Sequence, residues 1–224
     1  MVRDLLRYVK RSIKSTLLGN RVSQAFDGEA PAEVYDEMYA TSQEAALHYT
    51  NSRYYFIWTV ILDRILKGSP EARVLEIGCG RGQFAKMLID QGIGSYRGFD
   101  FSSKAIELAN QMSLPRSAFH VGNAYTEPLL ESAQNLFDVV VCTEVLEHID
   151  EDLLVLKRLQ TGTRLIATVP NFPYFTHVRH FPDAESVRAR YCEFFKDFKV
   201  LGLRQPLPSE SIYWLFEGVI SHTE

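Results

Sequence analysis

Three glycines and a carboxylate in the middle of the chain have the residue types and spacing of a nucleotide-binding site. Gly78, Gly80 and Gly82 follow a short apolar segment, 73–77, and precede a segment with the apolar spacing of a helix. Such a turn directs free backbone N–H groups at the negative end of a ligand, and glycine lets that ligand approach closely. About twenty residues further on, Asp100 lies at the end of a second predicted strand, at the position where α/β nucleotide-binding folds hold ribose hydroxyls.

The spacing of these glycines separates two classes of ligand. Nicotinamide dinucleotides are bound by G-x-G-x-x-G/A, whereas this turn is G-x-G-x-G and has Gln83 at the sixth position. The charge of Glu76, just before the turn, would disfavour a pyrophosphate, whereas a ligand that carries an ammonium group would tolerate it. S-adenosylmethionine carries adenosine, a sulfonium, an ammonium group and a single carboxylate. The sequence therefore favours this cofactor over a nicotinamide dinucleotide.

Glu76 and the alternating glycines, followed by Asp100, resemble the class I S-adenosylmethionine-dependent methyltransferases over residues 73–170. The resemblance implies an α/β, Rossmann-like sheet of seven strands in the order 3-2-1-4-5-7-6, with strand 7 antiparallel, helices on both faces and an N-terminal helical cap. Members often have Asp where this chain has Asn123, whose carbonyl oxygen can still accept a hydrogen bond from the adenine amino group. The cofactor-binding residues implied are Glu76, Gly78, Cys79, Gly80, Gly82, Asp100, Phe101, Asn123, Ala124, Glu144 and Tyr39.

A second group of chemistry-bearing residues follows the predicted fourth strand, in 143–149. Glu144 lies three residues before Glu147 and four before His148, so the three share one face of a helical turn. Because an imidazole titrates near neutral pH, His148 is predicted to remove the acceptor's proton, with Glu147 orienting it. In the alternative, the Glu-His pair caps a helix or bonds a loop, since related methyltransferases of many specificities carry it.

The same residues also permit a metal-binding interpretation. With His177 or His180 they would form a Glu-Glu-His-His set, which resembles the small-RNA 3′-end 2′-O-methyltransferases that use a divalent metal. The histidines lie in His-Val-Arg-His without that family's longer pattern, and the formal net charge of −4 argues against a nucleic-acid binder. We therefore predict no metal ion and no nucleic-acid partner. The RNA enzyme and a non-catalytic cofactor-binding protein remain the alternatives.

The segment 171–181 is rich in aromatic residues and histidines and has no helical or strand period. It follows the predicted fifth strand, where loops on a rigid scaffold carry specificity. We expect it to bind a small-molecule methyl acceptor, such as a sugar, a quinone-like compound or another metabolite, that is methylated on oxygen or nitrogen. The predicted acceptor-binding residues are Tyr35, Asn171, Tyr174, His177, Arg179 and His180.

The elements that must position these residues alternate between strand and helix from residue 73 onward. This alternation implies a parallel sheet whose carboxyl-end edge collects the glycine turn, Asp100 and the segment after the fourth strand. An antiparallel pair of strands closes the chain. The predicted strands are 73–77, 95–99, 118–121, 137–143, 164–169, 198–204 and 212–220, and the predicted helices are 82–91, 103–111 (capped by Ser102 or Ser103), 150–160 and 184–190.

Residues 1–70 are predicted to form an N-terminal helical segment and lid, and residues 71–224 the methyltransferase core. Residues 1–19 have the pattern of a basic amphipathic helix that docks on the domain or contacts a membrane surface. A polar linker at 20–31 is expected to be mobile. Helices are predicted at 32–46 and 51–66, and the Tyr-x-x-x-Tyr spacing of Tyr35 and Tyr39 resembles a helix that covers the cofactor in sugar and small-molecule methyltransferases.

Length and composition fit one domain with an elaboration, or one domain and a small second one. The three cysteines are scattered and odd in number, which indicates reduced thiols and a cytoplasmic protein. No apolar run reaches the ~18 residues of a transmembrane helix. The N-terminus lacks the apolar core of a signal peptide. The sequence predicts neither the acceptor's identity nor the oligomeric state.

Overall fold

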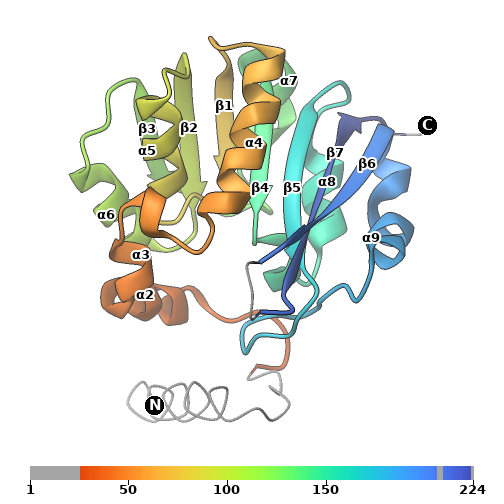
Figure 1. Cartoon of the computed structure of the whole chain (residues 1–224), viewed down its shortest axis with the longest axis horizontal. Coiled ribbons are helices and arrows are strands. Elements are labelled where there is room, and N and C mark those ends of the chain that lie inside the picture. The colour runs from red at the N-terminus through yellow and green to blue at the C-terminus, as the bar shows by residue number, and fades with distance from the viewer. Residues whose placement is uncertain (1–25, 206–208, 223–224) are drawn as a thin grey trace.

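The described part of the chain contains one sheet of seven strands in the order β3-β2-β1-β4-β5-β7-β6 (Figure 1). The computed structural model describes residues 26–205 and 209–222. Strand β7 runs antiparallel to its neighbours β5 and β6, and the other pairs are parallel. The predicted order and the predicted antiparallel strand are confirmed. The strands are β1 (Arg73–Ile77), β2 (Ser95–Asp100), β3 (Ser117–Val121), β4 (Val139–Thr143), β5 (Arg164–Pro170), β6 (Phe195–Arg204) and β7 (Ile212–Ile220).

Helices lie on both faces of this sheet and across one of its edges (Figure 1). The α-helices are α2 (Ala32–Thr41), α3 (Gln43–Ala46), α4 (Tyr55–Gly68), α5 (Gln83–Asp90), α6 (Ser103–Gln111), α7 (Ala133–Leu136), α8 (Asp152–Arg158) and α9 (Ala184–Tyr191). The 3₁₀ turns are η1 (Tyr49–Asn51), η2 (Pro128–Ser132), η3 (Leu146–His148) and η4 (Cys192–Phe194).

Some predicted boundaries are wrong near the N-terminal cap. The single helix predicted at 32–46 breaks at Ser42, whose backbone is extended and whose hydroxyl accepts a hydrogen bond from the Ala45 N–H. This hydrogen bond from the backbone to the serine side chain replaces a bond within a continuous helix, so one helix ends and the next begins here. The helix predicted to start at residue 51 begins instead at Tyr55.

Alternating side chains of the sheet build a core on each face. On β1, Val74 packs with the cluster that includes α4 and α5, while Leu75 and Ile77 pack with the cluster that includes α8 and α9. Strand β4 lies between β1 and β5, and its residues Val139–Cys142 are almost completely buried. This explains its unbroken apolar run, because a central parallel strand is covered on both faces.

The carboxyl ends of the parallel strands meet at the edge that α2 and α3 cross (Figure 1). Helix α2 is attached to α6 by Asp36, whose carboxylate accepts hydrogen bonds from the Ser102 hydroxyl at 2.6 Å and the Lys104 N–H at 3.0 Å. The Ser102 hydroxyl also accepts from the Ala105 N–H and caps α6, as predicted. Helix α2, part of the segment predicted to be a lid, is therefore attached over the edge where the site was predicted.

The segment before α2 is not the mobile linker that its polar sequence predicts, as far as the structure describes it. Ala30 is buried, and the Glu29 N–H donates to the Asp150 carboxylate at 3.2 Å. In return the Glu29 carboxylate accepts from the Asp150 N–H and from the Tyr125 hydroxyl. These long-range contacts hold residues 26–31 on the core.

The amphipathic helix predicted at residues 1–19 lies outside the described residues. Within the described ranges, none of the helices combines the length and the apolar character needed to cross a bilayer.

Candidate active site

The glycine turn between β1 and α5 is held against the end of β2. The Gly78 and Cys79 N–H groups donate to the Phe99 carbonyl at 2.9 and 3.0 Å, and the Gly80 N–H donates to the Asp100 carboxylate at 2.9 Å. Gly78 has φ +71° and Gly80 has φ +52°, conformations that glycine adopts without the strain of a side chain. The turn thus links the two strands that end at the predicted cofactor site.

Asp100 is a buried carboxylate at the tip of β2. It accepts from Gly80 N–H and from Ser102 N–H, both at 2.9 Å, yet burial still raises its pKa to about 6. The pocket beside it, which we call the Asp100 pocket, is also lined by Phe101, Asn123 and Ala124. The Asn123 side-chain oxygen accepts from the Tyr125 N–H at 2.8 Å, which fixes the amide and leaves its NH₂ and one lone pair for a ligand.

Glu76 faces a second pocket, which we call the Glu76 pocket. Its carboxylate accepts a hydrogen bond from the Tyr96 hydroxyl, and burial raises its pKa to about 8. A buried carboxylate with a raised pKa gains most from a ligand that brings a positive charge. Cys79 and Gly80 line the same pocket, whereas Gly82 lines neither pocket and supplies a left-handed turn with φ +79° before α5.

Arg53 is a pocket residue that the sequence analysis missed. It lines the Glu76 pocket, and its guanidinium lies 5.1 Å from the centre of the Tyr54 ring. Among the described residues the guanidinium has no hydrogen bond and no ion pair. An arginine without a partner in a pocket suits a carboxylate ligand. The only signal in the sequence was a lone basic residue in an aromatic stretch, Arg-Tyr-Tyr-Phe.

The two pockets meet beside α2. Both are lined by a common set of side chains and backbone from α2, the glycine turn and the end of β4. Tyr39 lies against the turn so closely that a Cβ at Gly80 would be 2.9 Å from its hydroxyl. The Tyr35 ring packs edge-on against Phe101, and its hydroxyl lies 2.9 Å from His148 Nδ1. The shared residues are Tyr35, Tyr39, Gly78, Glu144 and His148.

Two carboxyls follow β4 at this junction, Glu144 partly exposed and Glu147 buried. Glu144 has φ +56°, and its side chain accepts from the Thr168 hydroxyl at 2.9 Å. Burial raises the pKa of Glu144 to about 8. Glu147, in η3, is completely buried, and burial and the neighbouring Glu144 charge raise its pKa well above the usual range. Strained backbone at Glu144 is typical of a functional site.

Two histidines lie beside these carboxyls. His148 Nδ1 lies 3.0 Å from the Thr176 carbonyl, and His177 Nδ1 lies 3.2 Å from the Phe172 carbonyl. Because a carbonyl only accepts, the hydrogen-bond network assigns the hydrogen of each ring to Nδ1. Burial lowers the pKa of His148 to about 4, and burial together with His148 lowers that of His177 to about 3. Both rings are therefore neutral at pH 7.

Three predicted acceptor residues do not line either pocket, whereas Tyr35, Tyr174 and His177 do. Asn171 bonds through its side chain and its N–H to the backbone of Ile212, which ties β5 to β7. Arg179 donates to three backbone carbonyls of the loop after β4, and His180 is exposed. The pattern in 171–181 located the loop but did not separate the residues that support it from those that face the pocket.

The sheet order, the glycine turn and the carboxylate at the end of β2 together define the class I S-adenosylmethionine-dependent methyltransferases. A family model described as "Methyltransferase domain" matches residues 49–219, and the chain belongs to that family. The resemblance stated from the sequence is confirmed, and S-adenosylmethionine is the cofactor.

Similar proteins agree with this assignment. The N-methyltransferase NodS of Bradyrhizobium japonicum, solved with S-adenosylhomocysteine, superposes with a TM-score of 0.62 at 18% identity, covering 84% of this chain and 99% of that one. An S-adenosylmethionine-dependent methyltransferase of Anabaena variabilis gives 0.60 at 14% identity, covering 91% and 100%. A ubiquinone biosynthesis O-methyltransferase of Nitrosomonas europaea is 32% identical over 107 residues. That match covers 47% of this chain, which spans less than half of the relative's length (43%).

Proposed function

We propose that this protein transfers the methyl group of S-adenosylmethionine to a hydroxyl oxygen of a small, ring-containing acceptor. The observation that carries the proposal is the junction of two pockets at Glu144 and His148, one beside Asp100 and the other lined by aromatic rings. The aromatic wall of the Glu76 pocket suits a flat acceptor, such as a quinol-type metabolite. Its rings are Tyr54, Trp58, Phe172, Tyr174 and Tyr213.

The residues around both pockets fit the cofactor. Asp100 would accept hydrogen bonds from the ribose hydroxyls, with Phe101 and Asn123 beside the adenine. Glu76 would bind the ammonium group, and Arg53 would bind the carboxylate. These charges match a ligand with one ammonium and one carboxylate better than they match a pyrophosphate.

Bound S-adenosylmethionine supplies a methyl group that its sulfonium already activates. The protein must therefore align the acceptor, exclude water and provide for the acceptor's proton. Tyr35 and Tyr39 would close the junction of the pockets, and Tyr174 and His177 would position the acceptor. His148, predicted as the base, is neutral at pH 7 and free to take a proton, with Glu147 beside it.

Oxygen is favoured over nitrogen as the methylated atom because of the groups at this junction. A hydroxyl must lose its proton during the transfer, whereas a neutral amine can react first and lose its proton later. The junction holds two carboxyls and two neutral imidazoles, and an amine acceptor would not need such groups to take its proton during the transfer. The similarity to a ubiquinone biosynthesis O-methyltransferase supports the same choice.

The test begins with binding of S-adenosylhomocysteine, measured by calorimetry, to the wild type and to Asp100→Asn. The variant should bind about 10-fold or more weaker, since a hydrogen bond to a charged group is worth about 1.5–3 kcal/mol. Asp90→Asn, an exposed Asp on α5, is the matched control and should bind like the wild type. Radiolabelled methyl transfer should then be measured with quinol, sugar, amine and RNA acceptors. Labelling only of amines or RNA, or binding of NAD in place of S-adenosylhomocysteine, would refute the proposal.

A further inference from the structure

Glu147 is a buried carboxylate without a hydrogen-bond partner. Its exposed fraction is 0%, and neither carboxylate oxygen has a partner among the described residues. The nearby Arg179 does not satisfy it, because that guanidinium donates to backbone carbonyls and lies 3.4 Å from Asp152. Burying an unsatisfied carboxylate is costly, so such a group points to a ligand.

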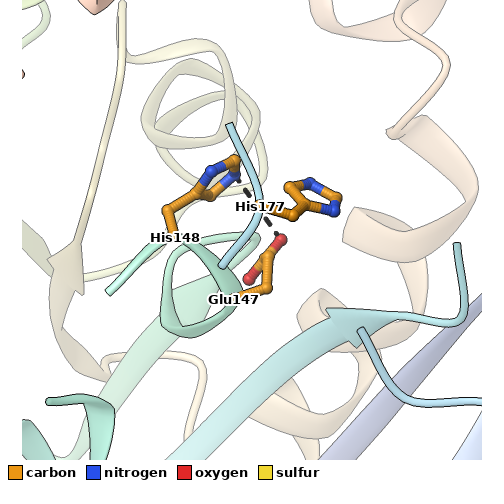
Figure 2. A group of neighbouring side chains, drawn as sticks. All are labelled: Glu147, His148 and His177. Atoms are coloured by element: carbon orange, nitrogen blue, oxygen red, sulfur yellow. Dashed lines mark ion pairs between the residues drawn. The ribbon is translucent and has the colours of Figure 1, made fainter. Parts of the chain in front are cut away.

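Two imidazoles converge on this carboxylate (Figure 2). His148 Nε2 lies 3.8 Å from Glu147 Oε1, and the rings of His148 and His177 are 4.6 Å apart. One ligand atom from each of the three residues lies within 4.8 Å of the other two. His148 comes from the turn after β4 and His177 from the loop after β5, so the group exists only in the folded protein.

The hydrogen bonds of both rings leave the correct atom free for a metal. The Thr176 and Phe172 carbonyls hold Nδ1–H of His148 and His177, which leaves a lone pair on each Nε2. Metal-binding histidines in proteins are oriented in this way, with the other ring nitrogen donating to a carbonyl or a carboxylate.

We propose that Glu147, His148 and His177 bind one divalent transition-metal ion at the wall of the Glu76 pocket. Two imidazoles and one carboxylate suit Zn²⁺ or Co²⁺, whereas Mg²⁺ and Ca²⁺ prefer oxygen ligands alone. At bond lengths near 2.1 Å, the ligand atoms of a tetrahedral site lie about 3.4 Å apart. The ligand atoms of the three side chains must therefore move about 1 Å closer to one another when the ion binds. Three protein ligands leave at least one position open for water or an acceptor oxygen.

This site deepens the proposed function and rests on it. An acceptor hydroxyl next to the ion would lose its proton more easily, and that proton would pass to solvent. The acceptor oxygen then forms a bond to the methyl carbon as the carbon–sulfur bond breaks and its electron pair stays on sulfur. Loss of the positive charge on sulfur balances loss of the negative charge on oxygen. His148 becomes a metal ligand in place of the predicted base.

The test measures metal binding without any acceptor. The full chain is stripped with a chelator and titrated with Zn²⁺ in a calorimeter and with Co²⁺ in a spectrophotometer. One equivalent should bind, and Co²⁺ should show the visible absorption of a low-symmetry nitrogen–oxygen site. Glu147→Gln and His177→Asn should each weaken binding by about 100-fold or more. His180→Asn is the matched control, because His180 lies in the same loop but is exposed, and it should bind like the wild type.

The outcomes separate this inference from the proposed function. S-adenosylhomocysteine should bind equally well before and after chelation, because its pockets do not need the ion. A stripped protein that binds S-adenosylhomocysteine but neither metal overturns the metal site and leaves the methyltransferase proposal intact. Metal binding that survives both Glu147→Gln and His177→Asn also overturns it. Thermal unfolding of each variant checks its fold. Because Glu147 and His177 lie on different loops, one variant still tests the site if the other does not fold.

Discussion

Ionisation of Glu76 should make the ligand-free protein less stable at alkaline pH, and Glu76→Gln should remove that loss. Burial raises the pKa of this carboxyl from its ordinary value of 4.5 to about 8, although the Tyr96 hydroxyl donates to it. Between these two values the folded protein holds a proton that the unfolded chain has released. The stability linked to Glu76 is therefore complete below pH 4.5 and is lost as the pH rises toward 8.

The size of the effect follows from these two pKa values. Each pKa unit of difference corresponds to about 1.4 kcal/mol, and Glu76 is partly titrated at both ends of the range, so it should lower the free energy of unfolding by about 3–4 kcal/mol between pH 5 and pH 8. Glu76→Gln keeps the size of the side chain and an oxygen to accept the Tyr96 hydrogen bond, but it cannot ionise. The variant and the wild type should be similarly stable at pH 5, and the variant should be more stable by about 3–4 kcal/mol at pH 8.

The assay is urea unfolding of both ligand-free proteins at several pH values from 5 to 8. Other buried acids titrate in both proteins, so the difference between the two curves isolates Glu76. Glu71→Gln, an exposed acid just before β1, should follow the wild type at every pH. Parallel curves for Glu76→Gln and the wild type would refute the reasoning. A rise in the variant's stability at pH 8 that is accompanied by undiminished binding of S-adenosylhomocysteine would refute the ammonium-binding role of Glu76.

Two further predictions concern the lid and the opposite face of the sheet. Asp36→Ala should raise amide hydrogen exchange across α2 by about tenfold or more, because it removes the hydrogen bonds that fasten α2 to α6, and S-adenosylhomocysteine should slow that exchange again. Exchange equal to that of Glu37→Ala, an exposed neighbour, would contradict this. Asp152→Ala should cost about 3 kcal/mol in urea unfolding, since the buried carboxylate accepts from Arg190 and from the Tyr191 hydroxyl. Asp138→Ala, which breaks only a half-exposed ion pair with Arg73 and one backbone bond, should cost clearly less.

The sheet was predictable from the sequence because its strands carry local signals. The strands β1 and β4 are short apolar runs that end at glycine or polar residues, and each predicted strand is found within three residues of its place. The start of α6 was predictable from Ser102, since helix capping depends on a few neighbouring residues. The strand order was not encoded in such local patterns and came from the resemblance.

Tertiary contacts explain what the sequence did not reveal. Glu29 lies in a polar stretch that looks like a linker, and only the distant Asp150 and Tyr125 hold it in place. Spacing within the chain could not separate His177 from His180, because the folded loop alone decides which ring turns toward Glu147. Arg53 and Glu76 are 23 positions apart in the sequence, and no periodic pattern brings them to one pocket.

The common wall of the two pockets has a consequence for binding equilibria. Tyr35 and Tyr39 face both the Asp100 pocket and the Glu76 pocket, so whichever ligand binds first restricts these side chains for the other. The second ligand then binds to a wall that is already ordered, and the two should bind with positive cooperativity. Thermodynamic linkage makes this reciprocal, because the factor by which the cofactor product tightens an acceptor analogue must equal the factor by which that analogue tightens the product.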